Sequence, residues 1–287
     1  MKDLRGKTAV ITGAGSGIGR GTARILAQKG VNVVVCDINA SRAEETAEEI
    51  RRMQVRSLAV PLDVSDRKSV YEAADRIERE MGNIHIIFNN AGIGSPRVPL
   101  EDTPDEDIDW LFGVNTLGVM NGIKAFVPKI KKHGQGGHVV NTASIAGLRT
   151  AEGMAIGLYS ASKMAVVALS QALKESLRGQ DIGVSVLCPA GVDTNILGAA
   201  AQRPDKFGGP IEREQPAAMA KALAEGLPPD EVGRCVAYAI EDGDMLFILT
   251  HPQTRRWIED RHKMLMDAYD KCDEMVATLG TPRTSQV

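Results

Sequence analysis

A glycine-rich turn near the start of the chain constrains the fold most strongly. It reads Thr12-Gly13-Ala14-Gly15-Ser16-Gly17-Ile18-Gly19, and it joins the apolar run Ala9-Val10-Ile11 to the helical stretch Arg20 to Lys29. Glycines let a backbone turn tightly and approach a pyrophosphate, and the free N–H groups of a helix start then hold the anion. The glycine spacing alone would also suit an ordinary turn, but strand, turn and helix in this order predict a dinucleotide-binding unit.

An acid follows the second apolar run of the chain. Val31 to Cys36 reads as a buried strand, and Asp37 stands at its end. A carboxylate at this place can accept hydrogen bonds from the adenosine ribose hydroxyls. It would also repel a 2′-phosphate, and the following Ile38 and Asn39 offer no cation to compensate. The sequence therefore predicts NAD over NADP, with a solvent-exposed acid as the alternative.

Short Val/Ile-rich runs alternate with longer amphipathic stretches along the chain. This rhythm is typical of an α/β fold with a doubly wound, seven-stranded parallel sheet and helices on both faces. We expect strands near 8–12, 32–37, 57–61, 84–89, 138–143, 183–188 and 245–250. We expect helices near 17–29, 41–53, 66–81, 104–132, 157–179, 230–242 and 253–276.

Polar residues follow two of these expected strands. The segment Asn89-Asn90-Ala91-Gly92 closes the run Ile84 to Phe88, and Ser144 closes the run Val139 to Thr142. In open parallel sheets the ligand crevice lies outside the carboxyl ends of the strands, so both should lie near the glycine turn. Asn115 lies inside an apolar helical stretch, where a buried amide without a partner would be costly.

Tyr159 and Lys163 stand four residues apart, which places both side chains on one face of a helix. A phenol with a pKa of about 10 is a poor base at neutral pH, but a neighbouring ammonium favours the phenolate. The pair therefore suggests proton transfer to or from an alcohol or carbonyl. Chance spacing on a surface helix is the alternative.

Taken together, these motifs resemble the short-chain dehydrogenase/reductase family over most of the chain, which implies a Rossmann fold and a tyrosine-based alcohol chemistry. The matching segments are Thr12 to Gly19, Asp63-Val64, Asn89 to Gly92, Asn115, Ser144, Tyr159 to Lys163, and Pro189 to Thr194. The resemblance implies a catalytic tetrad of Asn115, Ser144, Tyr159 and Lys163, and no metal. It implies an NAD site formed by Gly13, Ser16, Gly17, Ile18, Gly19, Asp37, Ile38, Asp63, Val64, Asn89, Ala91, Gly92, Tyr159, Lys163, Pro189, Val192 and Thr194.

The same resemblance implies a role for each of these side chains. Tyr159 would be the general base, and Ser144 would hydrogen-bond the reacting oxygen. Lys163 would lower the pKa of Tyr159 and bond the nicotinamide ribose. Asn115 would hold a water that relays protons, Thr194 would contact the carboxamide, and Asp63 and Val64 would flank the adenine.

Two places depart from the family pattern. The segment between Ser144 and Tyr159 is longer than usual, so we expect a small insertion at 149–156 beside the substrate. Ala190 stands directly after Pro189, where the family usually has glycine. Alanine fits there only if its φ is negative.

The substrate side is predicted from the stretch 192–219, which is rich in Gly and Pro and breaks the strand–helix rhythm. A stretch of this length is usually functional, so we expect a lid over the substrate. Apolar residues expected in the pocket favour an apolar or aromatic secondary alcohol. They are Ile145, Met154, Ile156, Leu158, Ile196 and Leu197.

Within the family, the region from Asp109 to Phe207 is most similar to the Cα-dehydrogenases of lignin-derived β-aryl ethers. The features that carry this similarity are Gly113-Val114-Asn115, Asn121-Gly122, His138 to Asn141, Asn195-Ile196 and Arg203-Pro204. The similarity implies oxidation of a benzylic alcohol. A ketone reductase acting on a steroid or 3-oxoacyl substrate and a non-catalytic NAD-binding regulatory protein are the alternatives.

The composition of the chain excludes several classes of binding partner. A net charge of −3 and a pI of about 6.0 give no basic surface for nucleic acid. The four cysteines are scattered and indicate neither disulfides nor a zinc site, and no apolar run has membrane-spanning length. We expect a cytoplasmic homo-oligomer, a tetramer or dimer, with a catalytic domain at 1–252 and a helical extension at 253–287 that begins beside His251.

Overall fold

A computed structural model describes residues 1–150, 155–214 and 217–279 of the chain. The chain divides into two compact units, Met1–Thr250 and His251–Val287. The first unit holds the sheet and every residue of the expected catalytic tetrad.

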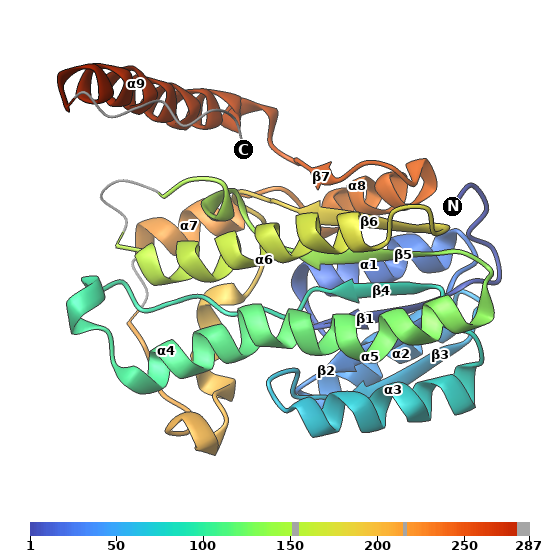
Figure 1. Ribbon diagram of the computed structural model, residues 1–287. Coiled ribbons are helices and arrows are strands. Elements are labelled where there is room, and N and C mark those ends of the chain that lie inside the picture. Colours follow the sequence, from blue (N-terminus) through green and yellow to red (C-terminus); the bar gives the residue numbers. More distant parts are fainter. Residues whose placement is uncertain (151–154, 215–216, 280–287) are drawn as a thin grey trace. The chain divides into compact units, whose positions relative to one another are not determined.

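Within the described residues, the first unit contains one sheet of seven parallel strands in the order β3-β2-β1-β4-β5-β6-β7 (Figure 1). The predicted doubly wound sheet is therefore confirmed. The order reverses between β1 and β4, which opens a crevice at the carboxyl ends of these strands. The strands are β1 Thr8–Thr12, β2 Asn32–Asp37, β3 Ser57–Pro61, β4 Ile86–Asn89, β5 Gly137–Thr142, β6 Ile182–Leu187 and β7 Phe247–Ile248.

Helices cover both faces of this sheet. On one face lie α1 Gly17–Gln28, α2 Ala40–Arg51 and α8 Pro229–Asp242, whose buried side chains form a single cluster with the strands. The other face is covered by α3 Arg67–Met81, α5 Gly118–His133 and α6 Gly157–Ser176, with α4 Asp105–Phe112 preceding α5.

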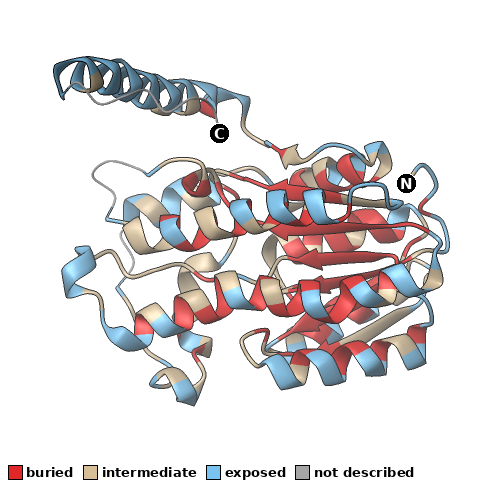
Figure 2. Ribbon diagram, viewed as in Figure 1, coloured by how far each residue is buried: buried red, intermediate tan, exposed pale blue. Residues whose placement is uncertain are grey.

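Side chains that alternate between the two faces of each strand form two hydrophobic cores, one on each side of the sheet. Ala9 and Ile11 of β1 pack toward α1, whereas Val10 between them packs toward the opposite helices. Successive strand side chains point to opposite faces, so strands covered on both sides must be apolar throughout. All five residues of β1 are buried, and Figure 2 shows the central strands as buried along their length.

The region 104–132, predicted as one helix, is interrupted. A π-helical turn, Gly113–Leu117, separates α4 from α5. The physical reason is Asn115, whose side chain bonds the backbone of Ile93 far away in sequence. Apolar periodicity continues through such a turn, so the pattern alone reads as a continuous helix.

The expected lid, residues 192–219, contains more regular structure than its composition suggests. It carries the 3₁₀ turns η4 Ile196–Gln202 and η5 Asp205–Phe207, and α7 Ala217–Ala224 begins inside it. At its base, the Leu227 N–H donates to the Gly191 carbonyl at 2.9 Å, and the Asp193 N–H donates to the Leu227 carbonyl at 3.1 Å. These two bonds close the segment into a loop with joined ends.

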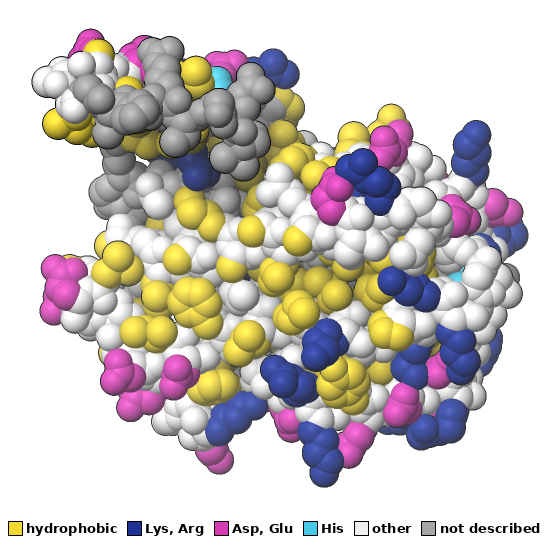
Figure 3. All heavy atoms as spheres, in the orientation of Figure 1, with side chains coloured by type: hydrophobic (Ala, Val, Ile, Leu, Met, Phe, Trp, Pro, Cys, Tyr) yellow, Lys and Arg dark blue, Asp and Glu magenta, His cyan; other side chains and the backbone are white. Residues whose placement is uncertain are grey.

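The outward face of α6 is apolar. Ala161, Ala168 and Ala172 are exposed, and Met164 and Leu169 are half-buried. Figure 3 shows apolar side chains gathered along α6, with charged side chains over α3. Small residues on an exposed helix face leave room for a second helix to approach closely.

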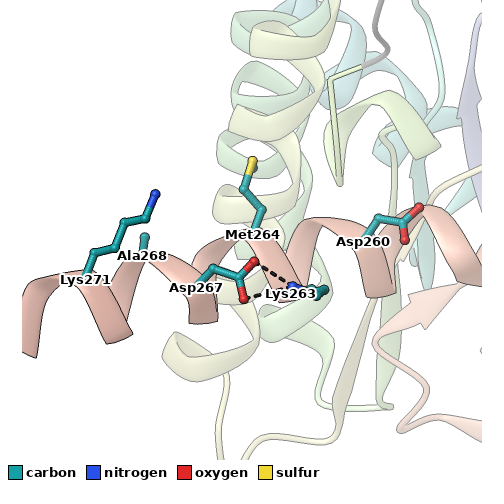
Figure 4. Close-up of a pocket in the computed structure, with 6 residues that line it drawn as sticks. All are labelled: Asp260, Lys263, Met264, Asp267, Ala268 and Lys271. Atoms are coloured by element: carbon teal, nitrogen blue, oxygen red, sulfur yellow. Dashed lines mark hydrogen bonds and ion pairs between the residues drawn. The ribbon is translucent and has the colours of Figure 1, made fainter.

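The second unit consists of a short turn, η6 Pro252–Thr254, and α9 Arg255–Leu279. The structure describes a shallow depression on α9 lined by Asp260, Lys263, Met264, Asp267, Ala268 and Lys271 (Figure 4). Lys263 Nζ lies 2.7 Å from an Asp267 oxygen there, a pair of exposed charges typical of a solvated helix face. In the described ranges, every helix falls short of the length and hydropathy that crossing a membrane requires.

The packing of α5 on β4 gives a stability prediction. A Cβ placed at Gly122 would lie 1.9 Å from Asn89 Oδ1, and Asn89 is held by its hydrogen bond to Asn141 at 2.8 Å. Gly122→Ala should therefore destabilise the protein by about 1–3 kcal/mol, measured by urea unfolding. Lys124→Ala on the exposed side of the same helix is the control and should stay within about 0.5 kcal/mol. Equal unfolding midpoints for the two variants would contradict this packing.

Candidate active site

The glycine turn after β1 lies in close contact with two other segments. A Cβ at Gly13 would lie 2.9 Å from Ala91 Cα, and one at Gly17 would lie 2.9 Å from Thr194 Cγ2. Both glycines also have positive φ, 64° and 50°. Only glycine fits such a conformation and such an approach. The structure thus brings the turn, the segment after β4 and Thr194 together at the expected cofactor site.

Asp37 is anchored at this turn. Its Oδ2 accepts from the Gly15 N–H and its Oδ1 from the Asn39 N–H, both at 2.9 Å. The carboxylate is buried, yet each oxygen keeps a lone pair that could accept a ribose hydroxyl. Sequence reasoning missed Arg42, whose Cβ would lie 2.7 Å from a Cβ at Gly15. A cationic residue thus begins beside the turn, from the first turn of α2 and beyond the two residues that follow Asp37.

Asp63, expected at the adenine, makes a contact that the sequence did not reveal. Its Oδ1 accepts from the backbone and hydroxyl of Ser65, and its Oδ2 lies 2.9 Å from Lys206 Nζ. Lys206 belongs to η5 of the lid. The expected adenine acid is therefore joined to the lid by an ion pair.

The two adjacent asparagines after β4 have different partners. Asn89 donates to Asn141 inside the sheet, so its side chain points away from the glycine turn. Asn90 donates instead to the carbonyls of Thr12 and Gly13, at 3.0 and 3.3 Å. A contact between Asn89 and a cofactor would have to use its backbone, and the predicted role of Asn89 stays a prediction.

Ser144, Tyr159 and Lys163 converge where β5 ends and α6 begins. Ser144 Oγ accepts from the Ala146 N–H at 3.1 Å, and this hydroxyl is near enough to Tyr159 to influence the pKa of the phenol. Lys163 Nζ donates to the Thr142 carbonyl at 3.0 Å and lies 5.8 Å from the centroid of the Tyr159 ring. This places a hydroxyl, a phenol and an amine around one point at the edge of the sheet.

Burial sets the proton affinities of this group. It raises the pKa of Tyr159, and the hydrogen bond from Ser144 acts in the opposite direction. It lowers the pKa of Lys163 to about 8. The expectation that Lys163 gives Tyr159 a low pKa therefore does not hold for the protein alone. The physical reason is that desolvation disfavours the phenolate more than the neighbouring dipoles favour it.

Asn115 ties the π-helical turn to the loop after β4. Its Oδ1 accepts from the Ile93 N–H at 2.9 Å, and its Nδ2 donates to the Ile93 carbonyl at 3.0 Å and to Ser162 Oγ at 3.1 Å. A Cβ at Gly92 would lie 3.2 Å from Lys163 Nζ and 3.3 Å from Asn115 Oδ1. Ser162 Oγ in turn donates to the Tyr159 carbonyl at 2.8 Å, which links Asn115 to the first turn of α6.

The structure describes the backbone at both places where the sequence departs from the family pattern, except at residues 151–154. In the described ranges, the non-glycine residues with positive φ are Gln54 and Ala155, so Ala190 satisfies its expected condition. Ala155, with a φ of 45°, lies inside the expected insertion. The pocket residues Ile145, Ile156, Ile196 and Leu197 are half-buried, and Met154 lies outside the described residues. Their contact with a substrate stays a prediction.

The lid is fastened to α4 by a buried cluster of charges. Asp107 on α4 accepts from Arg203 at 3.0 Å and pairs with Arg213. The Arg203 guanidinium also lies 5.6 Å from the centroid of the Trp110 ring. Asp107 and Arg203 are both buried, so each would be costly without the other.

A sequence profile of the short chain dehydrogenase family matches residues 7–205. A C alpha-dehydrogenase of Sphingobium sp. is 34% identical over 273 residues, which cover 93% of this chain and 88% of the relative.

Solved protein structures are also similar to this chain. A short chain dehydrogenase/reductase from Burkholderia phymatum in complex with NAD superposes with a TM-score of 0.84 at 34% identity, covering 100% of this chain and 99% of that one. The apo form of LigD from Sphingobium sp. superposes with a TM-score of 0.77 at 30% identity, covering 92% and 98%. Profile, relative and structures agree with the site geometry, and the chain belongs to the short-chain dehydrogenase/reductase family of oxidoreductases.

Proposed function

We propose that the protein is an NAD-dependent dehydrogenase that oxidises an apolar or benzylic secondary alcohol, with Tyr159 as general base. The observation that carries the proposal is the convergence of Tyr159, Ser144 and Lys163 at the carboxyl edge of the sheet. It is supported by the Sphingobium relative, which is named a C alpha-dehydrogenase, and by a similar structure in complex with NAD.

The residues at the crevice fit NAD. The glycine turn leads directly into α1, and within the described residues no side chain caps the N-terminus of this helix, so its first N–H groups could bind the pyrophosphate. Asp37 would accept the adenosine ribose hydroxyls, and Asp63 and Val64 would flank the adenine. Thr194 and Lys163 would hold the nicotinamide end. When bound, NAD supplies the acceptor for the hydride.

The protein's own residues handle the proton. As the alcohol carbon gives up its hydride, its hydroxyl must lose a proton, and Tyr159 is placed to take it. Ser144 would donate a hydrogen bond to the reacting oxygen and hold it beside the phenol. Burial raises the pKa of Tyr159, so the phenol would have to lose its own proton before it acts as the base. Lys163, with a pKa of about 8, is mostly charged at neutral pH, and a charge beside the phenol would offset part of this effect of burial. Asn115 fixes the loop that lies against Lys163.

The substrate class is inferred from the pocket and the relative. The described pocket residues are apolar, and an aryl alcohol suits such a lining. The reverse reaction on a ketone uses the same side chains. The apolar outward face of α6 supports the homo-oligomer, which stays a prediction.

Tyr159→Phe removes the proposed base and keeps the ring. It should lower the rate of NAD⁺ reduction, followed at 340 nm with a benzylic alcohol, by about 10²-fold or more. Calorimetry should show NAD⁺ affinity nearly unchanged. Tyr238→Phe, at an exposed tyrosine on α8, is the matched control and should keep full activity. Retained turnover in Tyr159→Phe would remove Tyr159 from the base role.

Asp37→Asn removes the charge and keeps an acceptor for the Gly15 N–H. The ratio of kcat/KM for NAD⁺ over NADP⁺ should fall about tenfold or more, because the 2′-phosphate is no longer repelled. Asp37→Ala should also weaken NAD⁺ itself, since the turn loses its anchor. Adding Arg42→Ala should cancel part of the gain for NADP⁺. An unchanged ratio in Asp37→Asn would show that Asp37 does not select the coenzyme.

Asp107→Ala leaves Arg203 buried without its carboxylate. The loss should cost about 3–5 kcal/mol locally and loosen the attachment of the lid to α4. We expect a raised KM for the alcohol and faster tryptic cleavage at Arg203 or Lys206, with a smaller change in the KM for NAD⁺. Asp109→Ala, at an exposed position of α4, is the control. If both variants bind the alcohol equally well, the buried cluster does not hold the lid for the substrate.

A further inference from the structure

Two side chains in the loop after β4 bury polar atoms without partners. Ser95 Oγ and Arg97 Nη2 are both buried and make no hydrogen bond, and no ion pair of Arg97 occurs within the described residues. A buried donor left unpaired costs about 1–3 kcal/mol, so native proteins rarely keep one without a reason. Here two such atoms lie two residues apart. The loop therefore holds two donors for which the described part of the protein supplies no hydrogen-bond partner.

Both ends of this loop are fixed to catalytic elements. At one end, Ile93 is held through its N–H and carbonyl by Asn115. At the other end, Leu100 lies against the start of α6, where a Cβ at Gly157 would be 3.2 Å from Leu100 Cδ2. Tyr159 follows in the first turn of that helix.

The middle of the loop lies beside the lid. A Cβ at Gly94 would be 3.9 Å from the Ile196 carbonyl, at the start of η4. Arg97 and Leu100 are three positions apart in the sequence, so their Cα atoms lie within roughly 11 Å of each other. Arg97 and Ser95 are therefore bracketed by Asn115, the start of α6 and the lid. Asp37 and Asp63, expected at the adenosine half of the coenzyme, follow other strands, β2 and β3.

The chemistry of these donors restricts the ligand. A guanidinium offers five N–H donors in one plane and no acceptor, and it matches carboxylate and other oxygen acceptors. A hydrocarbon ring alone would leave Nη2 and the serine hydroxyl unpaired. An acceptor oxygen would pair both.

We propose that Ser95 and Arg97 bind an acceptor oxygen on the substrate, on the part of the molecule away from the reacting carbon. This inference rests on the proposed alcohol dehydrogenase function and refines its substrate class. The substrate is an aromatic secondary alcohol whose ring carries an oxygen substituent, a carboxylate or an ether.

The test compares three alcohols that share the reacting carbon. They are 1-phenylethanol, 1-(4-carboxyphenyl)ethanol and 1-(3,4-dimethoxyphenyl)ethanol. The native protein should prefer at least one oxygenated alcohol by about tenfold or more in kcat/KM. Arg97→Met should remove this preference by raising KM, with kcat and the reaction of 1-phenylethanol nearly unchanged. Arg97→Lys should restore part of it for the carboxylate, and the two oxygenated alcohols distinguish an anionic from a neutral acceptor.

Two further measurements separate this role from a structural one. Because Arg97 Nη2 has no partner to lose, Arg97→Met should unfold at no lower urea concentration than the native protein. Arg178→Met, at an exposed arginine near the end of α6, is the matched control and should keep the substrate preference. A lower unfolding midpoint together with equal losses for all three alcohols would show that Arg97 only supports the fold, and would overturn the inference.

A binding measurement keeps this inference distinct from the proposed function. Calorimetry with the ketone 4-acetylbenzoate and NADH needs no turnover, and Arg97→Met should weaken binding of the ketone about tenfold. Weakened binding supports the inference even if no alcohol in the panel is oxidised, an outcome that would count against the proposed function alone. Unchanged ketone binding, or a loss confined to NADH affinity, would overturn the role of Arg97 while leaving the dehydrogenase proposal intact.

Discussion

The contact between the glycine turn after β1 and the segment after β4 holds the crevice together. Thr12 Oγ1 accepts from the N–H groups of Asn90 and Ala91, at 2.9 and 3.0 Å, and the Asn90 side chain returns a bond to the Thr12 carbonyl. Gly13 must be glycine because Ala91 Cα occupies the space of its side chain. These bonds join the two strands between which the order of the sheet reverses. Asp37 and Asn115 are positioned relative to that junction, because each bonds a loop that one of these strands begins.

Local sequence was sufficient where burial alone decides the structure. The bounds expected for 8–12, 32–37 and 57–61 coincide with β1, β2 and β3, because each is an apolar run closed by turn residues. The β7 strand is shorter than the expected 245–250, since Asp242 caps a turn by accepting from the Asp244 and Met245 N–H groups. The spacing of Tyr159 and Lys163 also survives, because both lie in one regular helix.

Local sequence patterns do not predict hydrogen bonds between residues that are far apart in the sequence. Asn115 bonds Ile93 across 22 positions, and Asp107 bonds Arg203 across 96. The hydrophobic periodicity of either segment does not identify such a distant partner. The π-helical turn and the attachment of the lid to α4 could therefore not be predicted from the sequence. The same holds for Ser95 and Arg97, which look like ordinary loop residues until the structure buries their polar atoms.

Acidic and basic side chains lie at different parts of the crevice. This distribution indicates which part of a ligand would bind at each place. The acids Asp37 and Asp63 follow β2 and β3, where an adenosine would offer hydroxyl and amino donors. The cations Lys163 and Arg97 belong to the region between β4, β5 and the lid, where acceptor oxygens would be favoured. Burial weakens the charge of Lys163, whose pKa falls to about 8, so part of its positive charge is lost just above neutral pH. An oxygen held by Arg97 would be bound by a side chain other than Tyr159 and Lys163, so the proposed substrate contact and the proposed proton transfer would depend on different groups.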